Sequence, residues 1–325
     1  PAPDPQPAPV MESGEPRPLF ATATPSLSLG VPSTVMLGSE FTFTATFDNT
    51  GADPGYGPFI DIVLPATGKD GDDGVSFVGA SYGGAAISGD NLFVQTFPDD
   101  GGGVGCVQHP IAVRPAGGAN GHGGGNPEVP VYYDVCGNAG DQFVTIVLPF
   151  GSFVPSQPPA TVTITAQMSD LADLDDVSTS GTNEGELDIY GQAGFQFGNT
   201  AIADFCCGPN YDATLPVDGD GEYTVPGDFP VSSTVEPSLL TISKSYSGPE
   251  GETATGPNYP RQFSINVDIA EGQTVGVASD LGQNLVITDT LPDNIQYLSL
   301  DSSSPAGASC SEPSTATPGG TLTCT

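Results

Sequence analysis

Positively charged side chains are the scarcest feature of this sequence. Five lysines and arginines oppose 39 aspartates and glutamates, which gives a formal net charge of −34. A chain this acidic repels the phosphate backbone of nucleic acids, so we exclude nucleic acid as a partner. The mutual repulsion of so many carboxylates calls for counter-ions, bound divalent cations or a saline medium, and Ca²⁺ is the natural candidate.

Long apolar segments are also missing. No run of 18 apolar residues occurs, so the sequence predicts no membrane-spanning helix. The chain opens at Pro1 without an initiator methionine or an apolar signal region, from which we expect a processed chain. Six cysteines in a Gly-rich and Pro-rich chain favour an oxidising location, either secreted or at the cell surface.

Helical periodicity is confined to one short acidic stretch, residues 168–177. Elsewhere apolar and polar residues alternate in short runs such as FTFTATF (41–47), FIDIVLP (59–65) and ATVTITAQM (160–168), and 44 glycines and 33 prolines separate these runs. Alternation with period two between turn residues is typical of β-sandwiches. The sequence therefore predicts an all-β fold.

Composition changes divide the chain into four parts. Residues 1–20 are rich in proline and predict an extended arm docked on a partner surface, such as a neighbouring subunit. Residues 21–200 predict a large sandwich, residues 201–236 a connector with two adjacent cysteines and an acidic loop, and residues 237–325 a second sandwich.

The segment LVITDTLPDNIQYLSL (285–300) begins with a pattern that also occurs in FIDIVLP (59–65). This similarity suggests that the chain contains two copies of one module. The first copy carries a seven-residue insertion that contains KDGDDG. The second copy spans only 89 residues and looks unfinished. We expect either a continuation beyond Thr325 or missing strands that a partner supplies.

Two stretches carry a family resemblance. FTATFDNTG in the first module, and LVITDTLPDNIQYLSL with the following ASC and LTC in the second, resemble the tandem-repeat domain of large bacterial and archaeal surface proteins, which is labelled domain of unknown function eleven. The resemblance implies exported, tandem immunoglobulin-like β-sandwiches that serve in envelopes, stalks, sheaths or adhesive fibres. It implies nothing specific about chemistry.

Two loops concentrate aspartate between glycines and are candidate Ca²⁺ sites. Ca²⁺ needs several oxygen ligands on a tightly turning backbone, although neither loop has the spacing of an EF-hand. Solvated Asp-Gly turns are the alternative explanation. The candidate ligands are Asp70, Asp72, Asp73, Asp218, Asp220 and Glu222.

The six cysteines allow fifteen complete pairings. Proximity favours Cys310 with Cys324, which flank a Gly-Gly turn, and then Cys106 with Cys136, which bracket a Gly-rich loop. Cys206 and Cys207 remain, and they could pair with each other or link to another chain.

Residues for catalysis are few, and we predict that this chain is not an enzyme. His109 and His122 are the only histidines, both lie in or beside loop sequence, and no recognisable nucleophile or metal-ligand spacing accompanies them. We interpret both histidines as incidental. Lys244 lies where a lysine forms an amide crosslink to Asn in some immunoglobulin-like surface domains, but an ordinary strand lysine is the favoured interpretation.

The sequence thus predicts an extracellular structural protein, a subunit of a surface layer, sheath or fibre. It would self-assemble into a homopolymer through its N-terminal arm or by strand addition, with Ca²⁺ and disulfides as stabilising features. One alternative is a surface adhesin that binds a glycan or host surface through residues 99–127. Another is an accessory region of a larger secreted hydrolase.

Overall fold

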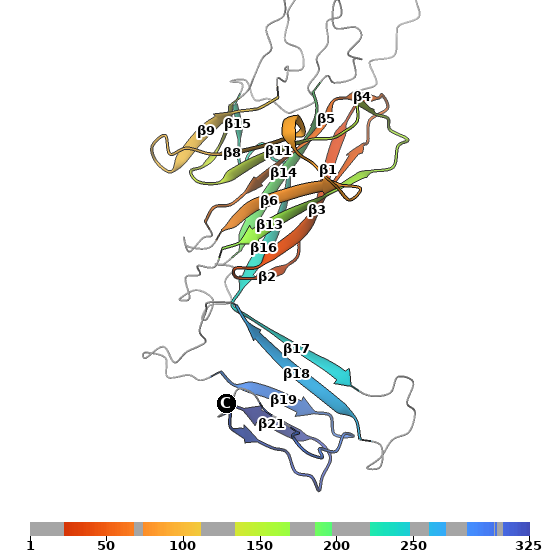
Figure 1. The fold of residues 1–325 in the computed structure, drawn as a ribbon, viewed down its shortest axis with the longest axis vertical. Helices are drawn as coiled ribbons and strands as arrows, with labels where there is room; N and C mark the ends of the chain where they lie inside the picture. Colours follow the sequence, from red (N-terminus) through yellow and green to blue (C-terminus); the bar gives the residue numbers. More distant parts are fainter. Residues whose placement is uncertain are drawn as a thin grey trace, which may run out of the picture. The chain divides into compact units, whose positions relative to one another are not determined.

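The structure is a computed structural model that describes residues 23–67, 74–111, 134–169, 186–196, 222–247, 260–270, 285–301, 303 and 308–325. Within these residues the regular structure is β-strand, apart from the 3-10 turn η1 (Gly89–Asn91). The all-β prediction is confirmed (Figure 1). The chain divides into two compact units, one formed mainly by residues 39–237 with the N-terminal residues, and one formed mainly by residues 238–325.

A five-stranded sheet forms one layer of the first unit, in the order β1-β3-β13-β6-β7. Its strands are β1 (Pro25–Gly30), β3 (Glu40–Asn49), β13 (Ala160–Met168), β6 (Val75–Tyr82) and β7 (Ala85–Ala86). The alternation in β3 places Phe41, Phe43, Ala45 and Phe47 on one buried face, as period two requires. These side chains form the core that this sheet shares with its neighbour.

A six-stranded sheet forms the second layer, in the order β2-β16-β14-β5-β11-β8. Its strands are β2 (Thr34–Met36), β16 (Val231–Ser238), β14 (Leu187–Phe195), β5 (Pro58–Leu64), β11 (Gln142–Val147) and β8 (Leu92–Thr96). Phe195 of β14 packs edge-on against Phe47 of β3, with 5.3 Å between ring centroids. This contact joins the two layers.

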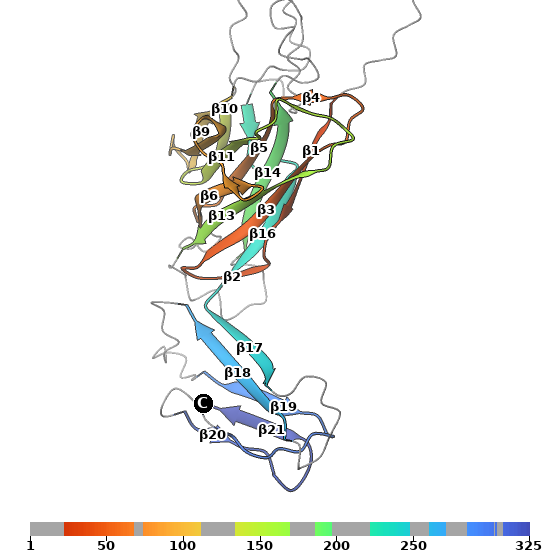
Figure 2. The ribbon, with the colours of Figure 1, turned by 45° about the vertical axis from the view of Figure 1, so that its right-hand side comes forward.

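The central strand β5 is buried at every residue, because its two faces are covered by different layers. A three-stranded sheet in the order β15-β10-β9 lies over the second face, where an apolar cluster includes Phe59 of β5, Phe143 of β11, and Val135 and Tyr223 of the small sheet. The small sheet consists of β15 (Glu222–Thr224), β10 (Asp134–Asn138) and β9 (Val104–Gln108) (Figures 1 and 2). The first unit therefore has three layers.

Glycine permits close packing at one point of this second face. A Cβ on Gly194 of β14 would lie 2.3 Å from the ring of Phe59 in the adjacent strand. Two short strands, β4 (Gly55–Tyr56) and β12 (Ser152–Phe153), pair with each other at the edge of the unit.

The prediction of a connector over residues 201–236 is wrong for its last part. Residues 222–224 form β15 and residues 231–238 form β16, and both strands belong to sheets of the first unit. β15 has only three residues and β16 contains several serines and threonines, so neither gave a strong apolar alternation.

The second unit contains two small sheets. One is the hairpin of β17 (Leu240–Ser247) and β18 (Gln262–Ile269), and the other has the order β19-β21-β20. The strands of the latter are β19 (Ile287–Leu291), β20 (Cys310–Ser311) and β21 (Gly320–Cys324). Tyr297 donates a hydrogen bond to a Glu312 carboxylate oxygen at 2.6 Å, and burial together with this carboxylate raises the pKa of Tyr297 to about 12.

Candidate functional site

A row of polar side chains crosses the middle of the six-stranded sheet on its second face. In the strand register, Asp61 of β5 lies opposite Thr145 of β11 on one side and opposite Gln192 of β14 on the other. All three side chains are buried. Residues opposite one another on paired strands share a face, so the register alone brings this row together.

The Asp61 carboxylate is the acceptor at the centre of the row. Thr145 Oγ1 donates to Oδ1 at 2.7 Å, and Gln192 Nε2 donates to Oδ2 at 3.0 Å. His109 Nε2 lies 3.2 Å from Oδ1 and 3.1 Å from Oδ2. Three donors thus compensate the cost of removing this carboxylate from water.

His109 follows the end of β9 and is fully buried between two aromatic rings. Its ring centroid lies 5.4 Å from that of Phe59 and 5.6 Å from that of Phe143. Nδ1 lies 3.0 Å from the carbonyl oxygen of Ile111 and 3.2 Å from its amide nitrogen. The protonated ring can donate to the carbonyl and the neutral ring can accept from the amide, so both charge states have a partner.

The interpretation of His109 as an incidental loop residue is therefore wrong. The sequence placed it in loop residues without a visible partner, but Asp61 is 48 positions away and is reached only through the fold. Its neighbours in the sequence, Gln108 and Pro110, gave no apolar alternation that would have signalled burial. His122 lies outside the described residues.

The Asp61–His109 pair differs from a hydrolytic triad in the group that the second ring nitrogen of His109 faces. In a hydrolytic triad, the nitrogen of histidine that does not face the aspartate faces a hydroxyl or thiol. Here that nitrogen faces the backbone of Ile111. The Asp61–His109 pair is thus suited to fastening β9 and the following residues onto the six-stranded sheet.

The pH dependence of stability should report this pair. Burial lowers the pKa of His109, but the charge of Asp61 and the hydrogen bonds to Asp61 and Ile111 outweigh burial and raise the pKa above 6.5. Since the folded pKa is raised, the contribution of His109 is fully present below about pH 6.5 and is lost as the pH rises through the folded pKa. We expect the free-energy difference between the native chain and His109→Gln to shrink from pH 6 to pH 9 in urea unfolding.

An NMR titration of the imidazole signals provides the control for this prediction. Asp61→Asn removes the charge that raises the pKa of His109 and should shift its titration midpoint to lower pH. A midpoint that Asp61→Asn leaves unchanged would show that the carboxylate does not control this proton.

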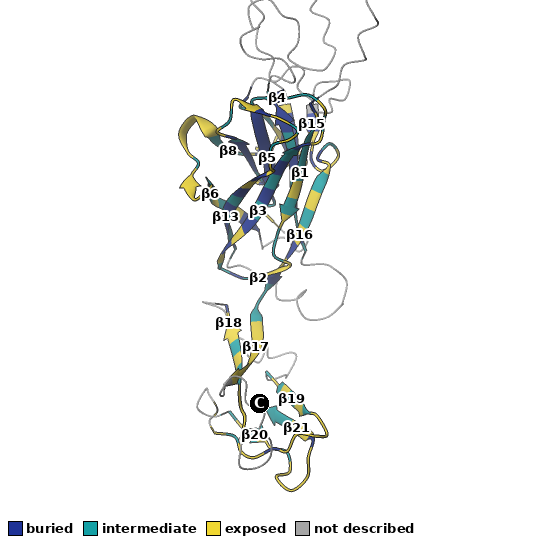
Figure 3. Ribbon diagram, turned by 90° about the vertical axis from the view of Figure 1, so that its right-hand side faces the viewer, coloured by how far each residue is buried: buried dark blue, intermediate teal, exposed yellow. Residues whose placement is uncertain are grey.

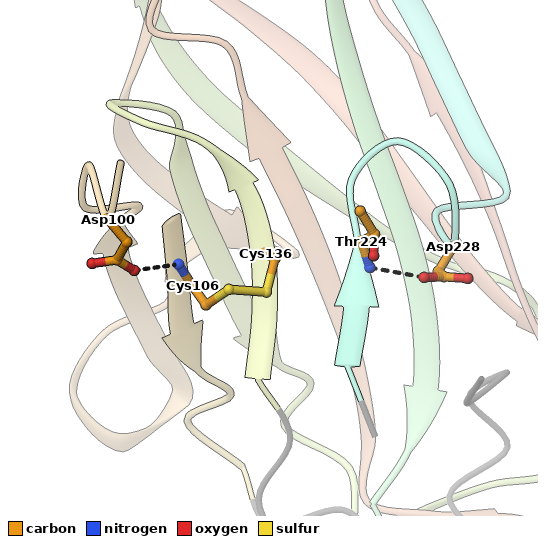
Figure 4. Close-up of a disulfide and its surroundings, with 5 residues drawn as sticks. All are labelled: Asp100, Cys106, Cys136, Thr224 and Asp228. Atoms are coloured by element: carbon orange, nitrogen blue, oxygen red, sulfur yellow. Dashed lines mark hydrogen bonds between the residues drawn. A yellow bond between two sulfur atoms is a disulfide. The ribbon is translucent and has the colours of Figure 1, made fainter. Parts of the chain in front are cut away.

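Both disulfides that the sequence favoured are present. Cys106 of β9 and Cys136 of β10 face each other in the strand register and are bonded, as Figure 4 shows. An Asp100 carboxylate oxygen accepts a hydrogen bond from the Cys106 amide at 3.3 Å. Cys310 and Cys324 are bonded between β20 and β21 of the second unit. Cys206 and Cys207 lie outside the described residues.

Five of the six candidate Ca²⁺ ligands lie outside the described residues. They are Asp70, Asp72, Asp73, Asp218 and Asp220. Glu222 is the first residue of β15, where it lies opposite Asp134 of β10. Among the residues that the structure describes, no cluster of three or more His, Cys, Asp or Glu side chains could hold a metal ion. Nor is any helix in this part of the chain long and apolar enough to cross a membrane.

The hairpin of the second unit exposes apolar side chains that its sequence arranges on one face. Along β17 and β18 the residues of this face pair as Leu240 with Ile269, Ile242 with Val267, Lys244 with Ile265 and Tyr246 with Phe263. The opposite face carries only Thr, Ser, Gln, Asn and Asp. We call the first of these the open face.

Both strands of the hairpin consist of exposed and intermediate residues, as Figure 3 shows. The exposed fractions are 60% for Ile242, 41% for Tyr246, 51% for Phe263 and 40% for Ile269. Strict alternation of this kind normally accompanies burial of the apolar face. Contiguous exposed apolar side chains mark interaction sites on soluble proteins.

Lys244 projects from the open face and is held by an ion pair. Its ammonium donates to both carboxylate oxygens of Asp289 on β19, at 2.7 and 2.8 Å. The favoured interpretation of an ordinary strand lysine is compatible with this contact, whereas an amide crosslink stays untested. The adhesin alternative expected aromatic side chains in residues 99–127. These residues contain no Phe or Tyr, which counts against a glycan-binding groove there.

Comparisons with known proteins identify no family. No protein-family model matches the chain, and a comparison with curated proteins gives no match. Among solved structures, a cohesin module from a family 33 glycoside hydrolase of Clostridium perfringens is 8% identical with a TM-score of 0.27, and the match covers 67% of this chain and 98% of the module.

Two further solved structures show similarly low scores. The sixth cohesin of Acetivibrio cellulolyticus scaffoldin B, in complex with a Cel5 dockerin mutant, is 10% identical with a TM-score of 0.24, covering 56% of this chain and 93% of that one. AvmM, which catalyses macrocyclization in alchivemycin A biosynthesis, is 10% identical with a TM-score of 0.26, covering 71% of this chain and 93% of that one.

Proposed function

We propose that this chain is an extracellular, non-catalytic structural protein that self-assembles through the open face of its second unit. The observation that carries the proposal is the amphipathic hairpin β17–β18, whose apolar side chains are 40–60% exposed at four positions. A surface of this kind is stabilised when a second chain covers it. The alternation in the sequence specifies a buried face, and assembly provides that burial.

The remaining features agree with an extracellular scaffold. One disulfide joins β9 to β10 in the first unit, and another joins β20 to β21 in the second. Disulfides persist in oxidising compartments, so both bonds support an extracellular location. His109 is buried inside the first unit beside the Asp61 carboxylate. Its second ring nitrogen faces the backbone of Ile111 rather than a hydroxyl or thiol. Tandem immunoglobulin-like repeats and Ca²⁺ binding by the acidic loops form part of the proposal.

Light scattering after size-exclusion chromatography tests the assembly. We expect the native chain to form oligomers whose size grows with concentration, and Ile242→Ser/Phe263→Ser to be monomeric over the same range. Each truncated side chain removes roughly 1.5–3 kcal/mol of apolar burial, which corresponds to an increase in dissociation constant of at least about tenfold.

The matched control changes apolar side chains of similar exposure in the first unit. Val78 of β6 is 50% exposed and Val94 of β8 is 44% exposed, so Val78→Ser/Val94→Ser should leave the oligomers intact. A native chain that stays monomeric at every concentration, with and without Ca²⁺, would refute the proposal.

A further inference from the structure

The open face combines aromatic rings with the positive charge that is scarce elsewhere. Of the five lysines and arginines, the described residues contain Lys244 and Arg261, and both lie beside this face. Lys244 Nζ lies 5.2 Å from the centroid of the Phe263 ring. The Arg261 guanidinium lies 5.7 Å from the centroid of the Tyr246 ring and donates to the Tyr246 hydroxyl at 2.7 Å.

The side chains of the open face indicate which kind of partner segment can bind to it. Tyr246 and Phe263 pack against each other with 5.5 Å between ring centroids, so they form a continuous aromatic surface. Exposed aromatic surfaces are the usual docking sites of proline-rich segments, which lose little entropy because their extended conformation is already formed. The ammonium of Lys244 is paired with Asp289, so Arg261 is the side chain that adds an attraction for carboxylates here.

One segment of this chain has both properties. Residues 1–20, PAPDPQPAPVMESGEPRPLF, contain seven prolines, the carboxylates of Asp4, Glu12 and Glu15, and a single arginine. The apolar side chains of Val10, Met11, Leu19 and Phe20 are interspersed among them. A segment of this kind offers carboxylates to Arg261 and apolar side chains to the two aromatic rings.

We infer that the open face binds residues 1–20 of a second copy of this chain. The inference rests on the proposed function and names its contact. Since the arm and the open face are different surfaces, each chain offers one of each, and the contact is head-to-tail. Such contacts continue from chain to chain and produce an open-ended array unless the rotation between subunits closes a ring.

A fluorescent peptide of residues 1–20, titrated onto the full chain, tests this contact by anisotropy. We expect saturable binding that Tyr246→Ser/Phe263→Ser weakens by roughly tenfold or more, because both rings of the platform are lost. Arg261→Gln, a milder change at an exposed position, should weaken binding severalfold and reduce its dependence on salt. Val78→Ser/Val94→Ser should bind like the native chain.

A peptide with Asp4→Asn, Glu12→Gln and Glu15→Gln should bind more weakly than the native peptide at low salt. Excess native peptide should also dissociate the oligomers seen by light scattering, because it occupies the open face without offering one. Thermal unfolding of each variant shows whether the second unit remains folded.

The outcomes separate this inference from the proposed function. If oligomers form and are lost in Ile242→Ser/Phe263→Ser, but the peptide neither binds nor competes, the arm is not the occupant and assembly by another segment stands. Peptide binding that Tyr246→Ser/Phe263→Ser leaves unchanged would likewise overturn the inference. If the native chain is monomeric throughout, the assembly and the arm contact between copies both fail.

Discussion

Asp61→Ala should destabilise the first unit by about 3–5 kcal/mol, the usual cost of removing one partner from a buried charged network. Three buried donors, from His109, Thr145 and Gln192, lose their acceptor in this variant. All of these side chains are buried, so they lie away from bulk water. The free energy of unfolding in urea, measured at pH 6, gives the effect directly.

Two variants serve as controls for Asp61→Ala. Asp188 of β14 also accepts side-chain hydrogen bonds, from Thr234 and Tyr190, but lies at a more exposed position, so Asp188→Ala should cost less than about 1 kcal/mol. Asp61→Asn keeps the side-chain volume and one acceptor oxygen, and should fall between the two. A cost below about 1 kcal/mol for Asp61→Ala would contradict the central role of this carboxylate.

Removing the disulfide of the first unit with Cys106→Ala/Cys136→Ala should cost roughly 3–4 kcal/mol in the chain-entropy model. The two cysteines are 30 positions apart, and the bond joins adjacent strands of the small sheet that covers Asp61 and His109. Hydrogen exchange measured by mass spectrometry should show faster exchange in residues 104–111 and 134–138. Residues 104–108 and 134–138 are the strands that the bond joins, and residues 109–111 directly follow β9.

The other disulfide is the matched control for this experiment. Cys310→Ala/Cys324→Ala opens a loop with a separation of 14 in the second unit and should leave exchange in β9 and β10 unchanged. Unchanged protection of β9 and β10 in Cys106→Ala/Cys136→Ala would mean that their backbone pairing and apolar contacts suffice without the bond.

Local patterns predicted the strands that alternate most strictly. FTFTATF became the buried face of β3 and ATVTITAQM became β13, because period two in such sequences fits only one secondary structure. Proximity and flanking turns were enough to predict both disulfides. These features depend on neighbours in the sequence or on short separations.

The polar row could not be predicted in the same way. Asp61 meets Gln192 across 131 positions and Thr145 across 84, and these contacts exist only once three strands take their register. FIDIVLP is a nearly continuous apolar run, which fits burial on both faces, but the run does not say which strands cover the second face of β5. The burial of His109 after β9 was not predicted for the same reason, because its partner Asp61 is distant in the sequence.

The position of Asp61 also distinguishes the native register of β5 from registers shifted by one residue. A one-residue slip of β5 would turn its side chains to the opposite faces and place the carboxylate among the phenylalanines of the five-stranded layer. The described residues on that face, such as Phe43, Phe47 and Ile164, are apolar and offer no donor to a carboxylate. An unpaired buried charge costs several kcal/mol, so a misaligned sheet is strongly disfavoured. One aspartate in an otherwise apolar strand thereby favours the native register of β5 over its one-residue slips.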